Sequence, residues 1–188
     1  MAVSGPHRIR RQQIIREAEG YLELISVYEE NAPSLPLKQR MCQRSLDLLN
    51  RLPDVGAERG HALYLKGQVL RTLERYEEAI PPLRDAAQLD PDNLQIWLAL
   101  GWCYKRTGRL DLAIEALEEG VSADPMQAIV YYNLACYWSL ARNKRNALDY
   151  LHRALELDGD FRYLLEQEHD FDPIRNDPGF QALLTVVV

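Results

Sequence analysis

The sequence predicts an all-α protein built from stacked antiparallel helix pairs, and two periodic patterns support this prediction. Small residues recur every 34 positions, at Gly67, Gly101 and Ala135. Large residues keep the same spacing, at Leu63, Trp97 and Tyr131. A fixed period of this length, with small and bulky positions in register, is typical of helical repeat arrays. Such arrays usually present a surface to another chain.

The clearest repeat covers residues 94–127. Its first helix has residues spaced three and four apart that share one helix face: Trp97, Leu100, Gly101 and Tyr104. Gly108 can adopt a positive φ and end this helix. The second helix is predicted to begin near Leu110 and to end before Pro125. We expect Gly101 and Ala113 where the two helices approach most closely, because neither side chain has bulk.

This pattern resembles the tetratricopeptide repeat. The second repeat meets the family motif at Trp97, Leu100, Gly101, Tyr104, Ala113, Leu117 and Pro125. The first repeat, 60–93, meets it at Leu63, Gly67, Leu70, Ala79, Leu83, Ala86 and Pro91, but has Lys66 where the motif is apolar. The third, 128–161, meets it at Tyr131, Leu134, Ala135, Trp138, Ala147, Leu151 and Ala154, with Gly159 in place of the proline. The resemblance implies a right-handed superhelix in which the first helix of each pair lines a concave groove.

Two amphipathic helices are predicted before the repeats, over residues 8–30 and 36–52, and a proline-containing break at 31–36 separates them. Residues 1–56 are therefore expected to form an N-terminal helical hairpin, with a degenerate repeat as the alternative. Residues 57–161 hold the three repeats.

Residues 162–188 are expected to cap the array, because a terminal repeat would otherwise expose its apolar face. A short helix is predicted over 161–168. Asp177 and Pro178 provide an N-cap and a first-turn proline for a final helix that runs through Leu184.

Composition excludes several function classes. The net charge of −6 argues against a general nucleic-acid binder. No stretch of about 18 apolar residues is present, so no membrane insertion is expected. The three cysteines, Cys42, Cys103 and Cys136, are widely spaced and form no Cys-x-x-Cys pair. This spacing disfavours a disulfide framework or a zinc site and favours a reducing, cytoplasmic setting.

No catalytic constellation, cofactor motif or metal-ligand spacing is recognisable, so the sequence does not predict an enzyme, a cofactor or a metal. The four histidines lie in unrelated segments: His7, His61, His152 and His169. Two acidic pairs, Asp158 with Asp160 and Asp170 with Asp172, lack the rest of a calcium loop and are better explained by helix capping. The downstream histidines make Cys136 a weak candidate nucleophile, but repeat packing accounts for its position.

The predicted functional site is the groove that the resemblance implies. On each first helix, the face next to the packed one carries aromatic, amide and cationic side chains, a composition that suits peptide binding. These residues are His61, Tyr64, Gln68 and Arg71, then Gln95, Leu98, Trp102 and Lys105, then Ile129, Tyr132 and Asn133 with Cys136. They are not the lysine- and asparagine-rich clamp with which some family members hold chaperone tails.

We therefore expect a non-catalytic protein-interaction module that binds a segment of another protein. The alternative is a self-assembling scaffold, a homo-oligomer whose groove accepts a second copy of the chain. A further alternative is that the apolar members of the set, Tyr64, Leu98, Trp102 and Tyr132, pack against adjacent helices or the chain's own flanks.

Overall fold

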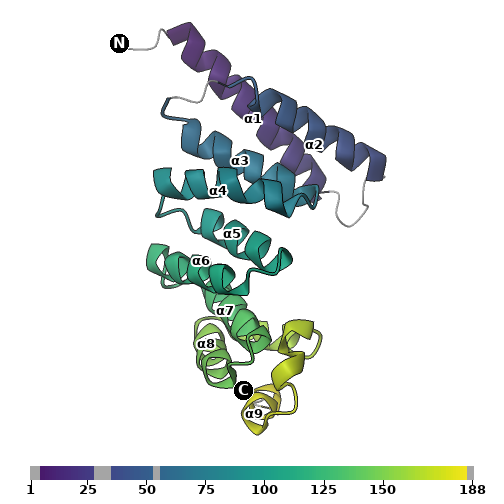
Figure 1. Cartoon of the computed structure of the whole chain (residues 1–188), viewed down its shortest axis with the longest axis vertical. Helices are drawn as coiled ribbons and strands as arrows, with labels where there is room; N and C mark the ends of the chain where they lie inside the picture. The colour runs from purple at the N-terminus through teal and green to yellow at the C-terminus, as the bar shows by residue number, and fades with distance from the viewer. Residues whose placement is uncertain (1–4, 28–34, 53–55, 186–188) are drawn as a thin grey trace. The chain divides into compact units, whose positions relative to one another are not determined.

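The computed structural model describes residues 5–27, 35–52 and 56–185, and all regular elements in these ranges are helical (Figure 1). The all-α prediction is confirmed. The α-helices are α1 (Gly5–Val27), α2 (Leu35–Leu49), α3 (Arg59–Thr72), α4 (Tyr76–Leu89), α5 (Leu94–Arg106), α6 (Leu110–Ala123), α7 (Ala128–Leu140), α8 (Lys144–Leu157) and α9 (Pro178–Thr185). Two 3-10 helices, η2 (Gly159–Leu164) and η3 (His169–Ile174), lie between α8 and α9.

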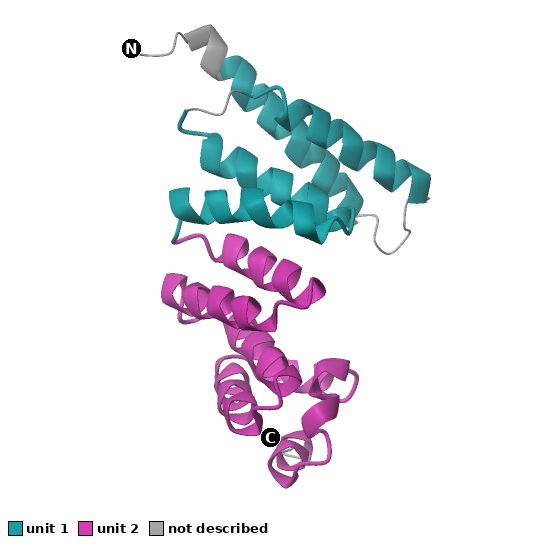
Figure 2. Cartoon of the chain, viewed as in Figure 1, with its two compact units in different colours: residues 1–91 teal, residues 92–188 magenta. Residues whose placement is uncertain are grey.

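The chain divides into two compact units, residues 1–91 and residues 92–188 (Figure 2). Unit 1 holds the pairs α1/α2 and α3/α4. Unit 2 holds the pairs α5/α6 and α7/α8, followed by the two 3-10 helices and α9. Within the described ranges, no helix is both long enough and apolar enough to cross a membrane.

Close helix approach explains the small residues of the repeat. A Cβ atom on Gly67 would lie 2.4 Å from Leu83 Cγ of α4, and one on Gly101 would lie 3.1 Å from Leu117 Cγ of α6. Ala79 and Ala113 on the facing helices are fully buried. In each pair, the bulky leucine of the second helix therefore packs directly against the glycine backbone of the first helix.

The first helix of each repeat ends in the same way. A residue with positive φ follows it: Glu74 at 59°, Gly108 at 76° and Arg142 at 58°. The next residue then donates its backbone N–H to the carbonyl five positions earlier, as Arg109 does to the Tyr104 carbonyl at 2.9 Å. This is the Schellman arrangement, and it turns the chain into the second helix.

Helices are present on both sides of the repeats, as predicted, but their bounds differ from those expected. Helix α2 ends at Leu49, three residues earlier than expected, and residues 28–30 of the first predicted helix lie outside the described ranges. The buried Ser45 hydroxyl donates to the Ala18 carbonyl at 3.1 Å and joins α2 to α1.

The helix predicted over 161–168 is instead η2, a 3-10 helix over residues 159–164. It starts early because the Asp158 side chain accepts a hydrogen bond from the Asp160 backbone N–H at 2.9 Å. The predicted cap of the final helix is present, since Asp177 Oδ1 accepts from the Gly179 N–H at 2.8 Å.

Candidate functional site

In unit 1, the predicted site residues of α3 form a connected polar row. The Gln68 amide donates to the Tyr64 hydroxyl at 2.8 Å, and Arg71 Nε donates to Gln68 Oε1 at 2.9 Å. His61 Nε2 lies 2.5 Å from Glu19 Oε1, which connects the row to α1. These contacts fix the side chains in place before any partner arrives, which lowers the entropy lost on binding.

In unit 2, the corresponding face of α5 centres on Trp102. This side chain is 38% exposed, whereas Leu98 beside it is half-buried and Gln95 is exposed. The Lys105 ammonium lies 5.4 Å from the centre of the Trp102 ring, and the Arg106 guanidinium lies 5.9 Å from it. Trp102 is therefore a large, partly exposed aromatic side chain with two cations close to its ring.

The third group of predicted site residues lies on α7 and is partly covered. Ile129 and Asn133 remain half-exposed, but Tyr132 is only 4% exposed. Its ring lies 4.8 Å from that of Phe161 and 5.6 Å, edge-on, from that of Phe171. Side chains of the chain's own C-terminal segment thus cover Tyr132, so this residue is not accessible to a partner in this arrangement.

An ion pair holds this C-terminal segment to the repeats in addition to the ring contacts on Tyr132, and a further ring contact lies within the segment. Lys105 of α5 pairs with Asp170 of η3, and both side chains are largely buried. Phe171 and Phe180 are fully buried, and their ring centres lie 5.3 Å apart. Lys105 was predicted as a groove cation, but no spacing rule connects it to a carboxylate 65 positions later in the chain.

Arg175 has a structural role that no sequence pattern indicates. Its guanidinium donates to the carbonyls of Leu165 at 3.3 Å, Glu166 at 3.0 Å and Glu168 at 2.6 Å. Its Nε also donates to Asp172 at 2.8 Å. The bonds to carbonyls fix the turn between η2 and η3, which places Glu168 and Asp170 beside α7.

Cys136 of α7 is buried next to these two carboxylates. One ligand atom from each of Cys136, Glu168 and Asp170 falls within 4.8 Å of the others. Burial, with a further contribution from Asp170 and Glu168, raises the pKa of the Cys136 thiol well above its usual value. The thiol is therefore protonated at neutral pH, which disfavours the nucleophilic role that the sequence left open.

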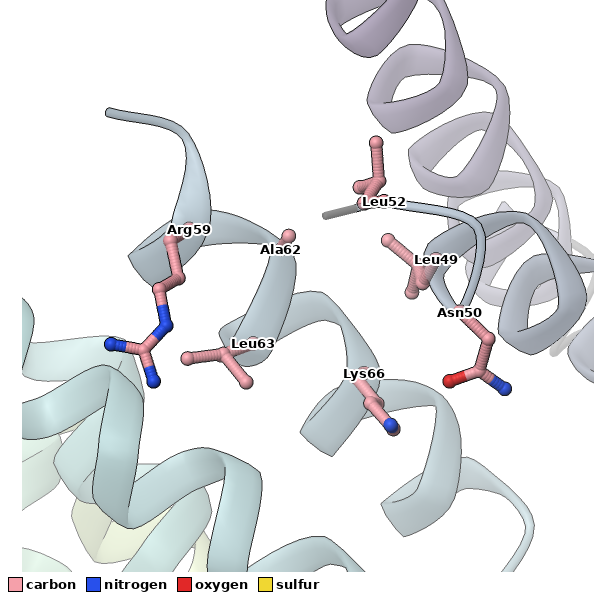
Figure 3. Close-up of a pocket in the computed structure, with 7 residues that line it drawn as sticks. All are labelled: Leu49, Asn50, Leu52, Arg59, Ala62, Leu63 and Lys66. Atoms are coloured by element: carbon pink, nitrogen blue, oxygen red, sulfur yellow. The ribbon is translucent and has the colours of Figure 1, made fainter. Parts of the chain in front are cut away.

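A pocket of about 190 Å³ lies in unit 1, where the end of α2 faces α3 (Figure 3). Leu49, Leu52 and Leu63 supply apolar walls, and the amine of Lys66 points away from them in Figure 3. Lys66 is the residue that departs from the repeat motif. Because pockets for small molecules usually exceed about 300 Å³, this one is a packing gap rather than a candidate ligand site.

Comparison with protein families supports the repeat assignment. Two family models, both described as tetratricopeptide repeat, match residues 37–93 and 70–135. Together they cover more than half of the chain. Among curated proteins, the chain is 25% identical over 120 residues to the anaphase-promoting complex subunit 3 of Schizosaccharomyces pombe. That match covers 64% of this chain and 18% of the relative, so the chain spans less than a fifth of the relative's length.

Solved structures show the same fold. YrrB, described as a TPR protein with an unusual peptide-binding site, matches with a TM-score of 0.61 at 25% identity. The match covers 80% of this chain and 73% of YrrB. MamA matches with a TM-score of 0.61 at 20% identity, over 80% of this chain and 85% of MamA.

Proposed function

We propose, from the premise that this chain belongs to the tetratricopeptide-repeat family, that it is a non-catalytic protein-interaction module. Its binding surface includes the α5 face around Trp102, and its ligand is an extended or helical segment of another protein. The family generally serves protein interaction, and YrrB is described as having a peptide-binding site. The anaphase-promoting complex subunit is by its name part of an assembly.

The exposure of Trp102 is the observation that carries this proposal. Tryptophan is enriched among the residues that dominate binding energy at interfaces. Here it is open to solvent, although a helix whose only task were packing would place a polar residue at this position. Leu98, one turn earlier, continues the apolar surface.

The chain's own C-terminal segment indicates what such a ligand offers. It places an aromatic side chain, Phe171, against α7 and a carboxylate, Asp170, on Lys105 of α5. On the neighbouring face, the Trp102 ring has a second cation beside it, the Arg106 guanidinium at 5.9 Å, while Lys105 is already paired with Asp170. We therefore expect the partner segment to pair an apolar anchor with an acidic residue.

Photo-crosslinking tests the proposal and identifies the ligand. A photoreactive amino acid replaces Trp102 in the full chain, expressed in its native cells, and the adducts are identified by mass spectrometry. The matched control is position 112, because Leu112 of α6 is 39% exposed, almost the same as Trp102. The proposal predicts a discrete adduct with a foreign protein from position 102 and none from position 112.

Two outcomes count against this reading. An adduct between two copies of the chain would favour the self-assembling alternative, and analytical ultracentrifugation would then show concentration-dependent oligomers. Equal, diffuse labelling from both positions would mean that the α5 face has no specific ligand.

A further inference from the structure

The strongest unexplained feature in the described part of the chain is the partly buried polar cluster between α7 and η3. It contains one thiol, Cys136, and two carboxylates, Glu168 and Asp170. Lys105 supplies one positive charge by pairing with Asp170. Two carboxylates against one ammonium leave the cluster with one negative charge in excess.

A second observation at the same place also points to a ligand. The Tyr132 hydroxyl is buried and has no hydrogen-bond partner among the described residues. Cys136, Glu168 and Asp170 are the three groups that interact electrostatically with this phenol. Leaving such a hydroxyl unpaired costs about 1–3 kcal/mol, and a carboxylate drawn toward a bound cation, or a water on that cation, would remove this cost by accepting its hydrogen bond.

We propose that Cys136, Glu168 and Asp170 form a binding site for one divalent metal ion of the thiolate-binding kind, such as Zn²⁺. Tyr132 donates a hydrogen bond to a coordinating carboxylate or to a water on the ion. This site shares Lys105 with the α5 face but does not require a partner to bind there, so either proposal can fail without the other.

The charges and distances fit this assignment. A divalent ion binds as the thiol proton leaves to solvent, so the cluster with Lys105 becomes neutral. Zinc–ligand bond lengths place neighbouring ligand atoms about 3.4–3.6 Å apart in a tetrahedral site, so the present limit of 4.8 Å requires a contraction of about 1 Å. Glu168 is half-exposed and can make that movement. A thiolate with carboxylates is a ligand set that zinc accepts, whereas calcium and magnesium prefer oxygen alone.

Lys105 is the competitor that the ion has to displace or accommodate. Its ammonium forms an ion pair with Asp170. The same ammonium lies 5.4 Å from the centre of the Trp102 ring and 5.5 Å from the centre of the Tyr137 ring. These rings can hold the cation after it leaves the carboxylate. A metal at this site would join η3 to α7, whereas the ion pair of Lys105 with Asp170 joins η3 to α5.

The test is a titration of the full chain with Co²⁺, which reports thiolate coordination by a charge-transfer absorption, followed by competition with Zn²⁺. We expect one Co²⁺ per chain, the charge-transfer absorption, and a melting temperature that rises with Zn²⁺. Cys136→Ala should abolish the absorption. Cys103→Ala is the matched control, because Cys103 is the other buried thiol of unit 2 and should leave the absorption unchanged.

A second pair of variants keeps the test valid if Cys136→Ala fails to fold. In Glu168→Gln, the side-chain oxygen can still accept from the Asp170 N–H, as Glu168 Oε1 does at 3.0 Å, so the η3 cap survives. This variant should weaken metal binding at least about tenfold. Lys105→Gln should tighten it, since the competing ammonium is gone. The absence of any charge-transfer absorption in excess Co²⁺ would overturn the proposal, as would full binding by both Cys136→Ala and Glu168→Gln.

Discussion

Single residues at the helix ends show where the repeat is locally strained. Glu74, Gly108 and Arg142 occupy equivalent positions and all adopt a positive φ, but only the glycine does so without steric cost. The three ends keep the same hydrogen bonds regardless. The repeat geometry therefore imposes a left-handed conformation on two residues that disfavour it.

We predict that Glu74→Gly and Arg142→Gly each stabilise the protein by about 1 kcal/mol, because glycine adopts the left-handed backbone conformation without a steric clash from a side chain. Both side chains are exposed, so little packing is lost. Gly108→Ala is the converse variant and should destabilise by a similar amount. Urea titrations of the three variants measure these changes, and a destabilised Glu74→Gly would contradict the account.

Close packing makes a second residue-scale prediction. Gly67→Ala should destabilise by about 1–3 kcal/mol, because its Cβ would overlap Leu83. Gly101→Ala should cost less, since Leu117 is farther away, and Gly101→Leu should cost more. Gly20→Ala is the control: Gly20 lies inside α1 with nothing within 4 Å of the new Cβ, so the change should stabilise by up to about 1 kcal/mol. Equal effects at Gly67 and Gly20 would mean that the α3/α4 approach is misplaced.

Among the elements, those of the C-terminal segment act together on α7. Phe161 and Phe171 cover Tyr132, Phe180 packs on Phe171, and Lys144 of α8 pairs with Asp177 at 2.9 Å. Without these elements the last helix pair would expose an aromatic face. The segment behaves as a structural cap, and its boundary at residue 162 stays a prediction.

We predict that deletion of residues 160–188 causes aggregation, because it uncovers Tyr132 and its neighbours. Phe171→Ala tests the same contact more gently and should cost about 3–5 kcal/mol. The exposed Tyr163, 81% accessible on η2, supplies the control, since Tyr163→Ala should leave stability nearly unchanged. Size-exclusion chromatography and thermal melts measure both effects. A monodisperse truncated chain with native helicity would disprove the cap.

The elements also show how far the sequence could predict this structure. The 34-residue period predicted the helix pairs of the repeats, and α6 begins at Leu110 as expected, because each motif position has one packing role. Two contacts were not predictable: the ion pair of Lys105 with Asp170, and the hydrogen bonds of Arg175 to three carbonyls. Both depend on how the non-repetitive C-terminal segment folds back onto the repeats. For the same reason the sequence offered Tyr132 as a groove residue and gave no hint that Cys136 meets two carboxylates.

At the scale of the whole molecule, buried phenols make stability fall in alkali. Burial raises the pKa of Tyr132 and of Tyr137 above the ordinary value near 10. Below that pH both states of the chain bind the phenolic proton and stability is unaffected. Above it the unfolded state releases protons that the folded state keeps, so stability drops as pH rises.

We therefore predict that, with a chelator present, the free energy of unfolding falls above about pH 10 by up to about 1.4 kcal/mol per pH unit for each buried tyrosine. Tyr132→Phe keeps the ring and removes the unpaired hydroxyl. It should match or exceed the wild-type stability at pH 7 and show a shallower fall above pH 10. Urea titrations across pH 7–11 decide the matter, and identical alkaline slopes for both chains would contradict the burial of this phenol.

The central claim is that the α5 face binds a protein segment through Trp102. Its most direct test is the affinity of the partner identified by crosslinking for Trp102→Ala, with Leu112→Ala as the control and a thermal melt of each variant. The account predicts binding weakened by about 2 kcal/mol or more for Trp102→Ala, wild-type affinity for Leu112→Ala, and melting temperatures close to wild type for both. Wild-type affinity in Trp102→Ala, together with a stability loss of about 3–5 kcal/mol, would show that Trp102 is a core residue and not a binding residue.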